Sequence, residues 1–306
     1  MAADAGTNRS LDNLRTENGM ATFRTMLTLG RVSNLPTIWS NCLAGWILAG
    51  GGDWQRWQHF VFVCLGATFL YLGGMYLNDA FDAAFDQQHR AERPIPSNKI
   101  TLSAVWQWGL SWLGLGLLCL GPLGTTTAIL ACLLLVCILV YDAVHKIFAL
   151  SPLLMAACRF FLVVVAASAT DTGVNGLSIW SGLVLAAYIV GLSYLARKES
   201  LRTGLRYWPC LLLAAPIVLA LIVNHGELFR ARGILISAIL TLWVLRCLRP
   251  AYWLPQRNVG RAVSGLLAGI VLVDYLAIGG STVGVGLIFL GLFVLALALQ
   301  RFIPAT

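Results

Sequence analysis

Long apolar stretches, many of them long enough to cross a membrane as a helix, alternate with short polar segments along most of the chain. A spanning helix needs roughly 20 mostly apolar residues. Ten stretches meet or approach this length: residues 34–51, 58–80, 102–120, 123–141, 151–170, 176–195, 208–223, 232–248, 261–279 and 281–300. The shortest contains Pro216, which predicts a kink or a re-entrant segment. The pattern predicts an all-α, polytopic membrane bundle of nine or ten transmembrane helices.

The rest of the chain gives no sign of a second domain. The first 30 residues are polar and contain no apolar core followed by a small-residue cleavage site, so we expect no cleaved signal peptide. Insertion then depends on the spans themselves. We expect a polar N-terminal segment at 1–30 and a single transmembrane domain at 31–306.

Composition excludes a water-soluble globule, because 58% of the residues are hydrophobic and 11% are charged, against about 25% charged in ordinary soluble domains. The net charge is +8. With the N-terminus inside, 17 of the 21 Lys and Arg fall in inner segments. Since loops rich in Lys and Arg stay cytoplasmic, we expect both termini and the polar loops in the cytoplasm of a bacterial inner-membrane protein. The charge then meets anionic lipid rather than nucleic acid.

Cysteine and histidine do not predict a metal centre. The eight cysteines lie in or beside apolar runs and form no CxxC pair, which is typical of small core residues. The four histidines lie at the ends of predicted helices without metal-ligand spacing, so we expect them at the membrane interface.

The most informative stretch follows the second apolar run, where Asp79, Asp82 and Asp86 are spaced i, i+3, i+7. On a helix these carboxylates lie within roughly 60° of arc, and a hard divalent cation would relieve their repulsion. Mg²⁺ typically takes one or two carboxylates, several waters and a substrate phosphate. If the helix continues, Arg90 and Arg93 share this face and can bind phosphate oxygens. The spacing favours a diphosphate site over a solvated helix end held by Asp–Arg pairs.

The pattern N-D-x-x-D-x-x-x-D-x-x-x-R-x-x-R-P-I-P-S, from Asn78 to Ser97, resembles the first aspartate-rich motif of the UbiA superfamily of intramembrane prenyltransferases. The segment from Arg31 to Thr37 is similar to that family's opening helix. The number and order of spans agree over essentially the whole chain. The resemblance implies an all-helical bundle with a central cavity open to the membrane, two Mg²⁺ ions and an allylic diphosphate donor.

Members of that superfamily carry a second aspartate-rich motif after the sixth span. The corresponding stretch here, 193–200, contains no aspartate, and Glu199 is its one candidate metal ligand. In one interpretation Arg197 and Lys198 neutralise the diphosphate directly in place of one Mg²⁺, because fixed cations stabilise the same charge. In the other, the protein binds an isoprenoid lipid without cleaving it. We favour the first interpretation.

A further part of the resemblance lies at the end of the fourth span. In the family, a tyrosine and a nearby lysine lie in this loop close to the diphosphate. Those roles would fall to Tyr141 and Lys146, whose spacing is one residue longer than in the commonest version. Together with the Ala-Arg-Lys-Glu stretch, the loop is most similar to the UbiA-like proteins encoded in ebo gene clusters.

These observations predict a Mg²⁺-dependent transfer of an isoprenoid chain to a small cyclic or aromatic acceptor. Negative charge builds on the diphosphate as an allylic cation forms, so fixed cations and aromatic faces beside the bond lower the barrier. The candidate catalytic residues are Asp79, Asp82, Tyr141, Lys146, Arg197 and Lys198; those for binding substrate are Asn34, Asn78, Arg90, Arg93 and Tyr194; those for metal are Asp79, Asp82, Asp86 and Glu199.

Two charged residues lie inside predicted spans, Arg159 in the fifth and Asp274 in the ninth. Intramembrane ionisable groups are functional candidates by default. Their predicted depths differ by about 9 Å at 1.5 Å per residue, so a direct pair requires tilted helices. Such charges leave transport of a lipid-linked or small polar metabolite as an alternative function. The acidic cluster lies at a helix end, however, where phosphate chemistry is easier to explain than translocation.

Overall fold

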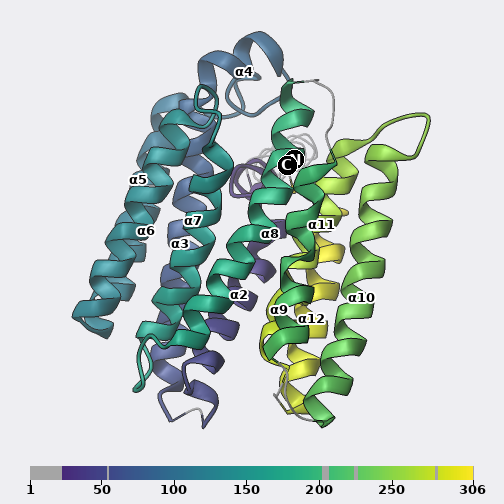
Figure 1. The fold of residues 1–306 in the computed structure, drawn as a ribbon. Helices are drawn as coiled ribbons and strands as arrows, with labels where there is room; N and C mark the ends of the chain where they lie inside the picture. The colour runs from purple at the N-terminus through teal and green to yellow at the C-terminus, as the bar shows by residue number, and fades with distance from the viewer. Residues whose placement is uncertain (1–22, 54, 202–206, 224–226, 280–281, 306) are drawn as a thin grey trace, which may run out of the picture.

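The computed structural model describes residues 23–53, 55–201, 207–223, 227–279 and 282–305, which form helices joined by turns, with no strand in these ranges (Figure 1). Residues 1–22 of the expected N-terminal segment lie outside the described residues. The α-helices are α2 (Leu35–Leu48), α3 (Trp57–Phe81), α4 (Ala83–His89), α5 (Leu102–Leu120), α6 (Thr125–Val144), α7 (Ser151–Ser168), α8 (Gly176–Leu201), α9 (Ala215–Val223), α10 (Glu227–Tyr252), α11 (Val259–Ala277) and α12 (Val283–Leu299). Short 3-10 helices are η1 (Val32–Asn34), η2 (Gly51–Asp53), η3 (Gly121–Leu123) and η4 (Trp208–Ala214).

The all-helical membrane bundle predicted from the apolar stretches is confirmed, whereas the count of nine or ten spans is not. Within the described ranges, seven helical segments are long and apolar enough to cross a membrane: Trp57–Phe81, Leu102–Leu123, Thr125–Val144, Ser151–Ser168, Gly176–Arg197, Arg230–Tyr252 and Val259–Ala277. Two further apolar helices, Trp208–Ile222 and Val283–Leu299, are shorter. Helix α2 has 14 residues, which at 1.5 Å each is less than the roughly 30 Å hydrocarbon core.

The segment 208–223 is broken, as its proline predicted. It begins as the 3-10 helix η4 and becomes α-helical only at Ala215, which places Pro216 in the first turn of α9. A proline is tolerated there because the first N–H groups of a helix have no intrahelical acceptor.

Helices α3 and α5 pack closely through glycine. A Cβ atom built on Gly73 would lie 2.7 Å from the Leu113 side chain and 2.9 Å from the carbonyl oxygen of Gly109. One built on Gly109 would lie 2.6 Å from the Leu77 side chain. Small residues allow such close approach of helices in membranes. This contact fixes the end of α3 that leads into the aspartate-rich motif.

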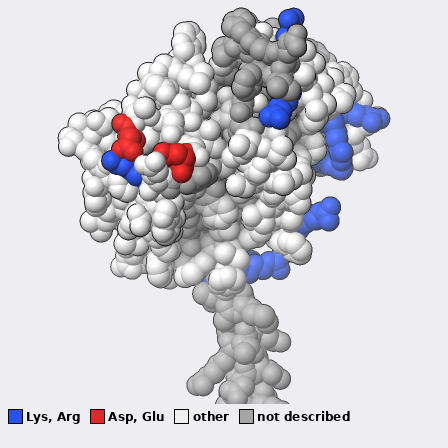
Figure 2. Space-filling view, turned by 90° about the horizontal axis from the view of Figure 1, so that it is seen from below, with Lys and Arg blue, Asp and Glu red and all other residues white. Residues whose placement is uncertain are grey.

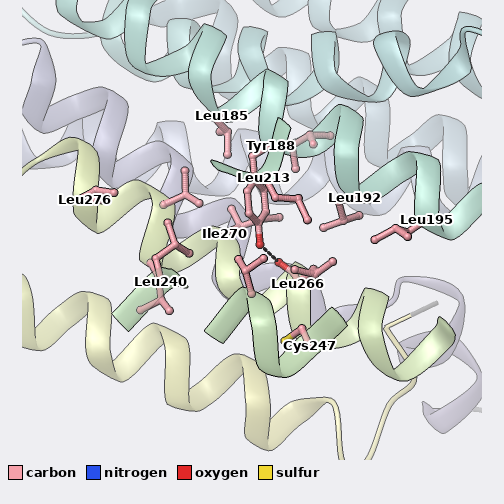
Figure 3. Packing of buried hydrophobic residues seen from close by; sticks show 14 of the residues in the cluster. Leu185, Tyr188, Leu192, Leu195, Leu213, Leu240, Cys247, Leu266, Ile270 and Leu276 are labelled. Atoms are coloured by element: carbon pink, nitrogen blue, oxygen red, sulfur yellow. Dashed lines mark hydrogen bonds between the residues drawn. The ribbon is translucent and has the colours of Figure 1, made fainter. Parts of the chain in front are cut away.

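Two large apolar clusters stabilise the bundle, one built mainly from α2, α3, α5, α6 and α7, the other mainly from α8, η4, α10 and α11. Figure 3 shows the second cluster, in which the fully buried Tyr188 donates a hydrogen bond of 2.9 Å to the carbonyl oxygen of Leu266. The buried hydroxyl is therefore satisfied without a ligand.

Arg159 and Asp274 do not pair directly; Asn41 of α2 connects them. Arg159 Nη1 donates to Asn41 Oδ1 at 2.7 Å, and Asn41 Nδ2 donates to Asp274 Oδ2 at 2.7 Å. The hydroxyl of Ser40 also donates to Asp274, and Arg159 Nη2 donates to the Thr37 hydroxyl at 3.1 Å. Because a buried charge is costly unless it is hydrogen-bonded, these bonds hold α2 between α7 and α11.

The two ends of the bundle differ in their charged groups. Helix α4 and the turns after it cover one end (Figure 1). Figure 2 looks onto the opposite end, where charged side chains are scattered over a mostly uncharged surface. An exposed ion pair between Arg56 and Asp171 belongs to that opposite end.

Candidate active site

The aspartate-rich motif occupies a break between two helices. Helix α3 ends at Phe81 and α4 begins at Ala83, with Asp82 between them. The backbone still bonds across the break, from Asp82 N–H to Asn78 O at 3.0 Å and from Asp86 N–H to Asp82 O at 2.8 Å. Asp79, Asp82 and Asp86 are all buried, with exposed fractions of 5%, 7% and 1%. Burial contradicts the solvated part of the alternative, whereas the Asp–Arg pairs that it proposed are present.

The prediction that one helix continues through Arg90 to Arg93 is also wrong, because α4 ends at His89. Arg93 precedes Pro94, and a residue before proline is disfavoured in helical conformation. The chain instead turns back through 90–99. This turn, rather than a helix face, brings Arg93 to the aspartates.

Arg93 bridges two of the three carboxylates. Its Nη1 atom lies 2.7 Å from Asp79 Oδ1 and 3.5 Å from Asp86 Oδ2. Burial lowers the pKa of Arg93, and burial raises the pKa of Asp86 despite this contact. Asp86 Oδ1 is buried and has no hydrogen-bond partner among the described residues. The site thus holds a carboxylate oxygen that is ready to accept a ligand.

The third carboxylate contacts the loop between α6 and α7. Asp82 lies 2.9 Å from Lys146 Nζ and 3.4 Å from His145 Nε2. Burial alone would raise the pKa of Asp82, but hydrogen bonds from His145 and Lys146 outweigh burial and lower it. Lys146 Nζ also lies 3.5 Å from the centroid of the Phe85 ring. His145, expected only at the membrane interface, is therefore part of the site.

Sequence reasoning missed Arg31, which enters the site from the chain before α2. Its Nη2 atom donates to Asp79 Oδ1 at 3.1 Å and to Asn78 Oδ1 at 3.2 Å. Its backbone is left-handed, with φ of 41°, a conformation uncommon outside glycine. The Tyr71 hydroxyl donates to its carbonyl oxygen at 3.2 Å. Arg31 was counted among the inner basic residues and begins the segment that resembles the family's opening helix, but it was given no role in the site.

Below these charges lies a partly open, mostly apolar cavity of about 80 Å³ between α2, α3, α6 and α7. Its lining includes the predicted Tyr141, whose ring stacks on His145 with centroids 5.1 Å apart. Two charged residues, Asp142 and Arg159, also line the cavity. Asp142 is joined to the site by Asn78, whose Nδ2 donates to Asp142 Oδ1 at 3.1 Å.

Other predicted residues contact different parts of the protein. Asn34 Nδ2 donates to the carbonyl oxygen of Ala305 at 3.0 Å, so its described contact is with the end of the chain. The Tyr194 ring lies 6.0 Å from the Trp208 ring, centroid to centroid. Arg90 follows α4 directly as its C-cap residue.

The residues of the altered second motif lie near the end of α8. Arg197 Nη1 donates to the backbone carbonyls of Phe148 and Ala149, at 2.7 and 2.6 Å, in the α6–α7 loop. The side chains of Lys198 and Glu199 lie outside what the structure describes.

The described residues hold no group of three or more His, Cys, Asp and Glu side chains arranged for a metal ion. Asp79 and Asp82 are instead paired with cations. Carboxylate oxygens are nevertheless the ligands that Mg²⁺ prefers, and one or two of them suffice when phosphate and water complete its shell. Together with the unpartnered Asp86 oxygen, this donor set fits Mg²⁺ that binds with a phosphate ligand.

Solved structures with the same fold are distant in sequence. A digeranylgeranylglyceryl phosphate synthase superposes with a TM-score of 0.57 at 16% identity, covering 90% of this chain and 98% of that one. A UbiA homologue from Aeropyrum pernix K1 gives 0.60 at 16% identity, covering 79% and 94%. One from Archaeoglobus fulgidus, bound to GPP and Mg²⁺, gives 0.60 at 15% identity, covering 90% and 98%. These likenesses show the fold.

A search of curated proteins finds no match. The model of the UbiA prenyltransferase family matches residues 38–255, which include the aspartate-rich motif, the α6–α7 loop and the altered second motif. Together with the fold, this match identifies an integral membrane protein whose family resemblance extends over most of its length. The chain belongs to the UbiA prenyltransferase family.

Proposed function

We propose that this protein is a Mg²⁺-dependent prenyltransferase that moves an isoprenoid chain from an allylic diphosphate to a small cyclic or aromatic acceptor. One observation carries the proposal: three buried carboxylates and the cations Arg31, Arg93 and Lys146 meet at one end of the bundle, next to an apolar cavity. A diphosphate with a hydrocarbon chain needs both surroundings. The A. fulgidus homologues bound to GPP or DMAPP with Mg²⁺ support this choice of donor.

In the ligand-free arrangement the carboxylates neutralise the cations that the diphosphate would use. Mg²⁺ held by Asp79 and Asp82, with Asp86 beside them, would stabilise the negative charge that develops on the diphosphate. Arg31, Arg93 and Lys146 are then free to donate to phosphate oxygens. Charge-assisted hydrogen bonds of this kind lower the barrier most when they are aimed at the developing charge.

The remaining predicted residues would act around this centre. The Tyr141 ring, which lines the cavity, and Tyr194 would shield the allylic cation from water. Asn78 positions Arg31, and Asn34 and Arg90 stay candidates for substrate contact. The site would lie on the cytoplasmic side of a bacterial inner membrane.

For the altered second motif, we propose that Lys198 supplies the positive charge that replaces one metal ion, and that Arg197, expected to do the same, acts through the α6–α7 loop instead. Arg197 holds the α6–α7 loop through two carbonyl groups and so fixes Lys146 near Asp82. Lys198 would add positive charge near the diphosphate, and Glu199 is the candidate second metal ligand. The alternative applies if these residues do not take the place of the second metal ion. In that case the chain is a UbiA-like protein that binds or transports an isoprenoid-linked or small metabolite.

Binding and turnover can be separated in purified protein reconstituted in lipid nanodiscs. We expect saturable binding of geranyl diphosphate that requires Mg²⁺. We also expect oxygen-18 placed in the ester oxygen on C1 to scramble into the non-bridging oxygens of the α-phosphate, which reports reversible cleavage of the C1–O bond. The double variant Asp79→Asn/Asp82→Asn should lose both while remaining folded. Binding without any exchange in the wild-type protein would favour the binding or transport alternative.

A further inference from the structure

The segment that follows α12 is docked onto the short helix η1, which precedes α2. Two of its side chains are buried, since Ile303 is 6% exposed and Ala305 is 4% exposed. Asn34, the last residue of η1, donates from Nδ2 to the carbonyl oxygen of Ala305 at 3.0 Å. The Ser33 hydroxyl donates to the carbonyl oxygen of Pro304 at 3.5 Å. Residues 303–305 are called the docked segment below.

The bond to Ala305 fixes which way the Asn34 amide points. A flipped amide would place its oxygen against the Ala305 carbonyl oxygen, and two acceptors cannot share a hydrogen bond. In the orientation present, Asn34 Oδ1 is buried and has no hydrogen-bond partner among the described residues. Because an unsatisfied buried acceptor lowers stability, the bond to Ala305 is kept although it leaves that oxygen unpaired. The docked segment therefore makes a specific contact with η1.

Asn34 also holds Arg31, the cation that enters the site from the chain before α2. The backbone N–H of Asn34 donates to the carbonyl oxygen of Arg31 at 2.9 Å, and the Tyr71 hydroxyl donates to the same oxygen at 3.2 Å. The φ of Arg31 is 41°, and a left-handed residue other than glycine persists only where its surroundings hold it. The Arg31 guanidinium then donates to Asp79 at 3.1 Å. Hydrogen bonds thus lead from the docked segment to the aspartate-rich motif.

The docked segment can support η1 because its own base is held in place. Gln300 donates from Nε2 to the carbonyl oxygen of Ser264 at 3.1 Å, which ties the end of α12 to α11. The backbone N–H of Ile303 donates to the carbonyl oxygen of Leu299 at 2.9 Å, which extends the last helical turn into the docked segment. The buried Ile303 side chain is the anchor between this base and the two carbonyl groups that contact η1.

We infer that the docked segment positions Arg31 for the diphosphate by holding η1, and that Ile303 is therefore a positioning residue for donor binding. This rests on the proposed function, in which Arg31 donates to phosphate oxygens. A guanidinium that is already in place spares the donor the cost of ordering a long side chain. Without the docked segment, η1 and the left-handed backbone of Arg31 can relax, so Arg31 must be ordered again each time the donor binds.

A double-mutant cycle on donor binding tests the inference. The full-length protein is held in nanodiscs, and binding of radiolabelled geranyl diphosphate is measured with Mg²⁺. Ile303→Asn puts a polar group at the buried anchor, and we expect it to raise the dissociation constant about three- to tenfold, the scale of ordering one long side chain. Phe302→Asn is the matched control, because Phe302 is the neighbouring residue and is 73% exposed. It should change the constant by less than about twofold.

The variant Arg31→Gln separates a positioning role from a general loss of stability. It should weaken donor binding by itself, and adding Ile303→Asn should then weaken binding by less than about twofold further, because the cation that Ile303 positions is gone. A merely structural role of Ile303 predicts instead that the two losses multiply. Where Ile303→Asn does not fold, Ile303→Ala makes the same comparison with a smaller expected loss.

Three results would overturn the inference: losses that multiply in the double variant, equal effects of the Ile303 and Phe302 variants, or unchanged donor binding in Arg31→Gln. Failure of the proposed function has a different signature, because the wild-type protein would then not bind geranyl diphosphate in the presence of Mg²⁺. That result would overturn the function and the positioning role together, whereas the other three leave donor binding by the wild-type protein intact.

Discussion

Arg93 and Asp79 are 14 residues apart in the chain, yet Nη1 of Arg93 lies 2.7 Å from Oδ1 of Asp79. The same guanidinium reaches Asp86 at 3.5 Å. The Arg93 guanidinium therefore contacts two carboxylates of the aspartate-rich motif. When a diphosphate binds, Arg93 can donate to the phosphate oxygens instead without leaving the site.

Replacing Arg93 should weaken donor binding. We expect Arg93→Gln to raise the dissociation constant for geranyl diphosphate with Mg²⁺ by about 10- to 100-fold, the effect of losing charge-assisted hydrogen bonds. Radioligand binding in nanodiscs measures it. Arg93→Lys keeps the positive charge but not the planar set of N–H donors, so it should weaken donor binding less than Arg93→Gln does.

Lys99→Ala is the matched control for that experiment. Lys99 lies in the turns after α4, near Arg93 in the chain, and is exposed. Removing its charge should change donor binding by less than about twofold, because exposed charges are screened. An equal loss in both variants would show that overall charge, not the Arg93 contact, governs binding.

The contacts of Asp82 should make stability depend on pH. Because the folded-state pKa of Asp82 lies below its ordinary value of 3.8, ionised Asp82 stabilises the fold above that pH, and this stabilisation is lost as pH falls through the folded pKa. Asp82→Asn should therefore lower the melting temperature at pH 6, with a difference from wild type that shrinks below pH 3.8. Thermal melts in nanodiscs across this range measure it. If the difference in melting temperature between wild type and Asp82→Asn stays constant down to the lowest pH, ionised Asp82 does not stabilise the fold through these contacts.

The sequence predicts some parts of this fold and site better than others. The apolar run at 102–120 coincides with α5, because a membrane helix is set by local composition. The grouping of Asp79, Asp82 and Asp86 follows from helical spacing, which survives the break at Asp82.

The partners of these aspartates were harder to predict. Arg31 and Lys146 lie far from the aspartates in the chain, so no local spacing reveals them. The family resemblance predicted a site role for Lys146, whereas Arg31 was missed. Arg93 was placed in the site for the wrong reason, since α4 ends at His89 and a turn, not a continuous helix face, supplies the contact. Helix α2 is also shorter than the apolar run predicted at 34–51, because η1 precedes it and a turn and η2 follow Leu48.

Arg197 should affect turnover more than donor binding, because its described contacts are with the loop that carries Lys146. We expect Arg197→Met to reduce product formation about tenfold or more, and to increase hydrogen exchange of amides in 145–150, while the dissociation constant for geranyl diphosphate changes little. Arg249→Met removes an exposed arginine at the end of α10 and serves as the control. A large loss of donor binding in Arg197→Met would instead place this guanidinium on the diphosphate.

The glycine contact between α3 and α5 offers a test of what holds the motif in place. Gly73→Ala would bring its new methyl group to 2.9 Å from the Gly109 carbonyl oxygen and 2.7 Å from the Leu113 side chain, so the helices must separate. We expect a loss of about 1–3 kcal/mol in the free energy of unfolding, as for other overpacked contacts. Gly114→Ala on α5 is the matched control, because its Cβ would meet nothing within 4 Å. It should be neutral or stabilising by up to about 1 kcal/mol, since alanine favours helix over glycine. If both variants melt alike, the close approach of α3 and α5 contributes nothing to stability.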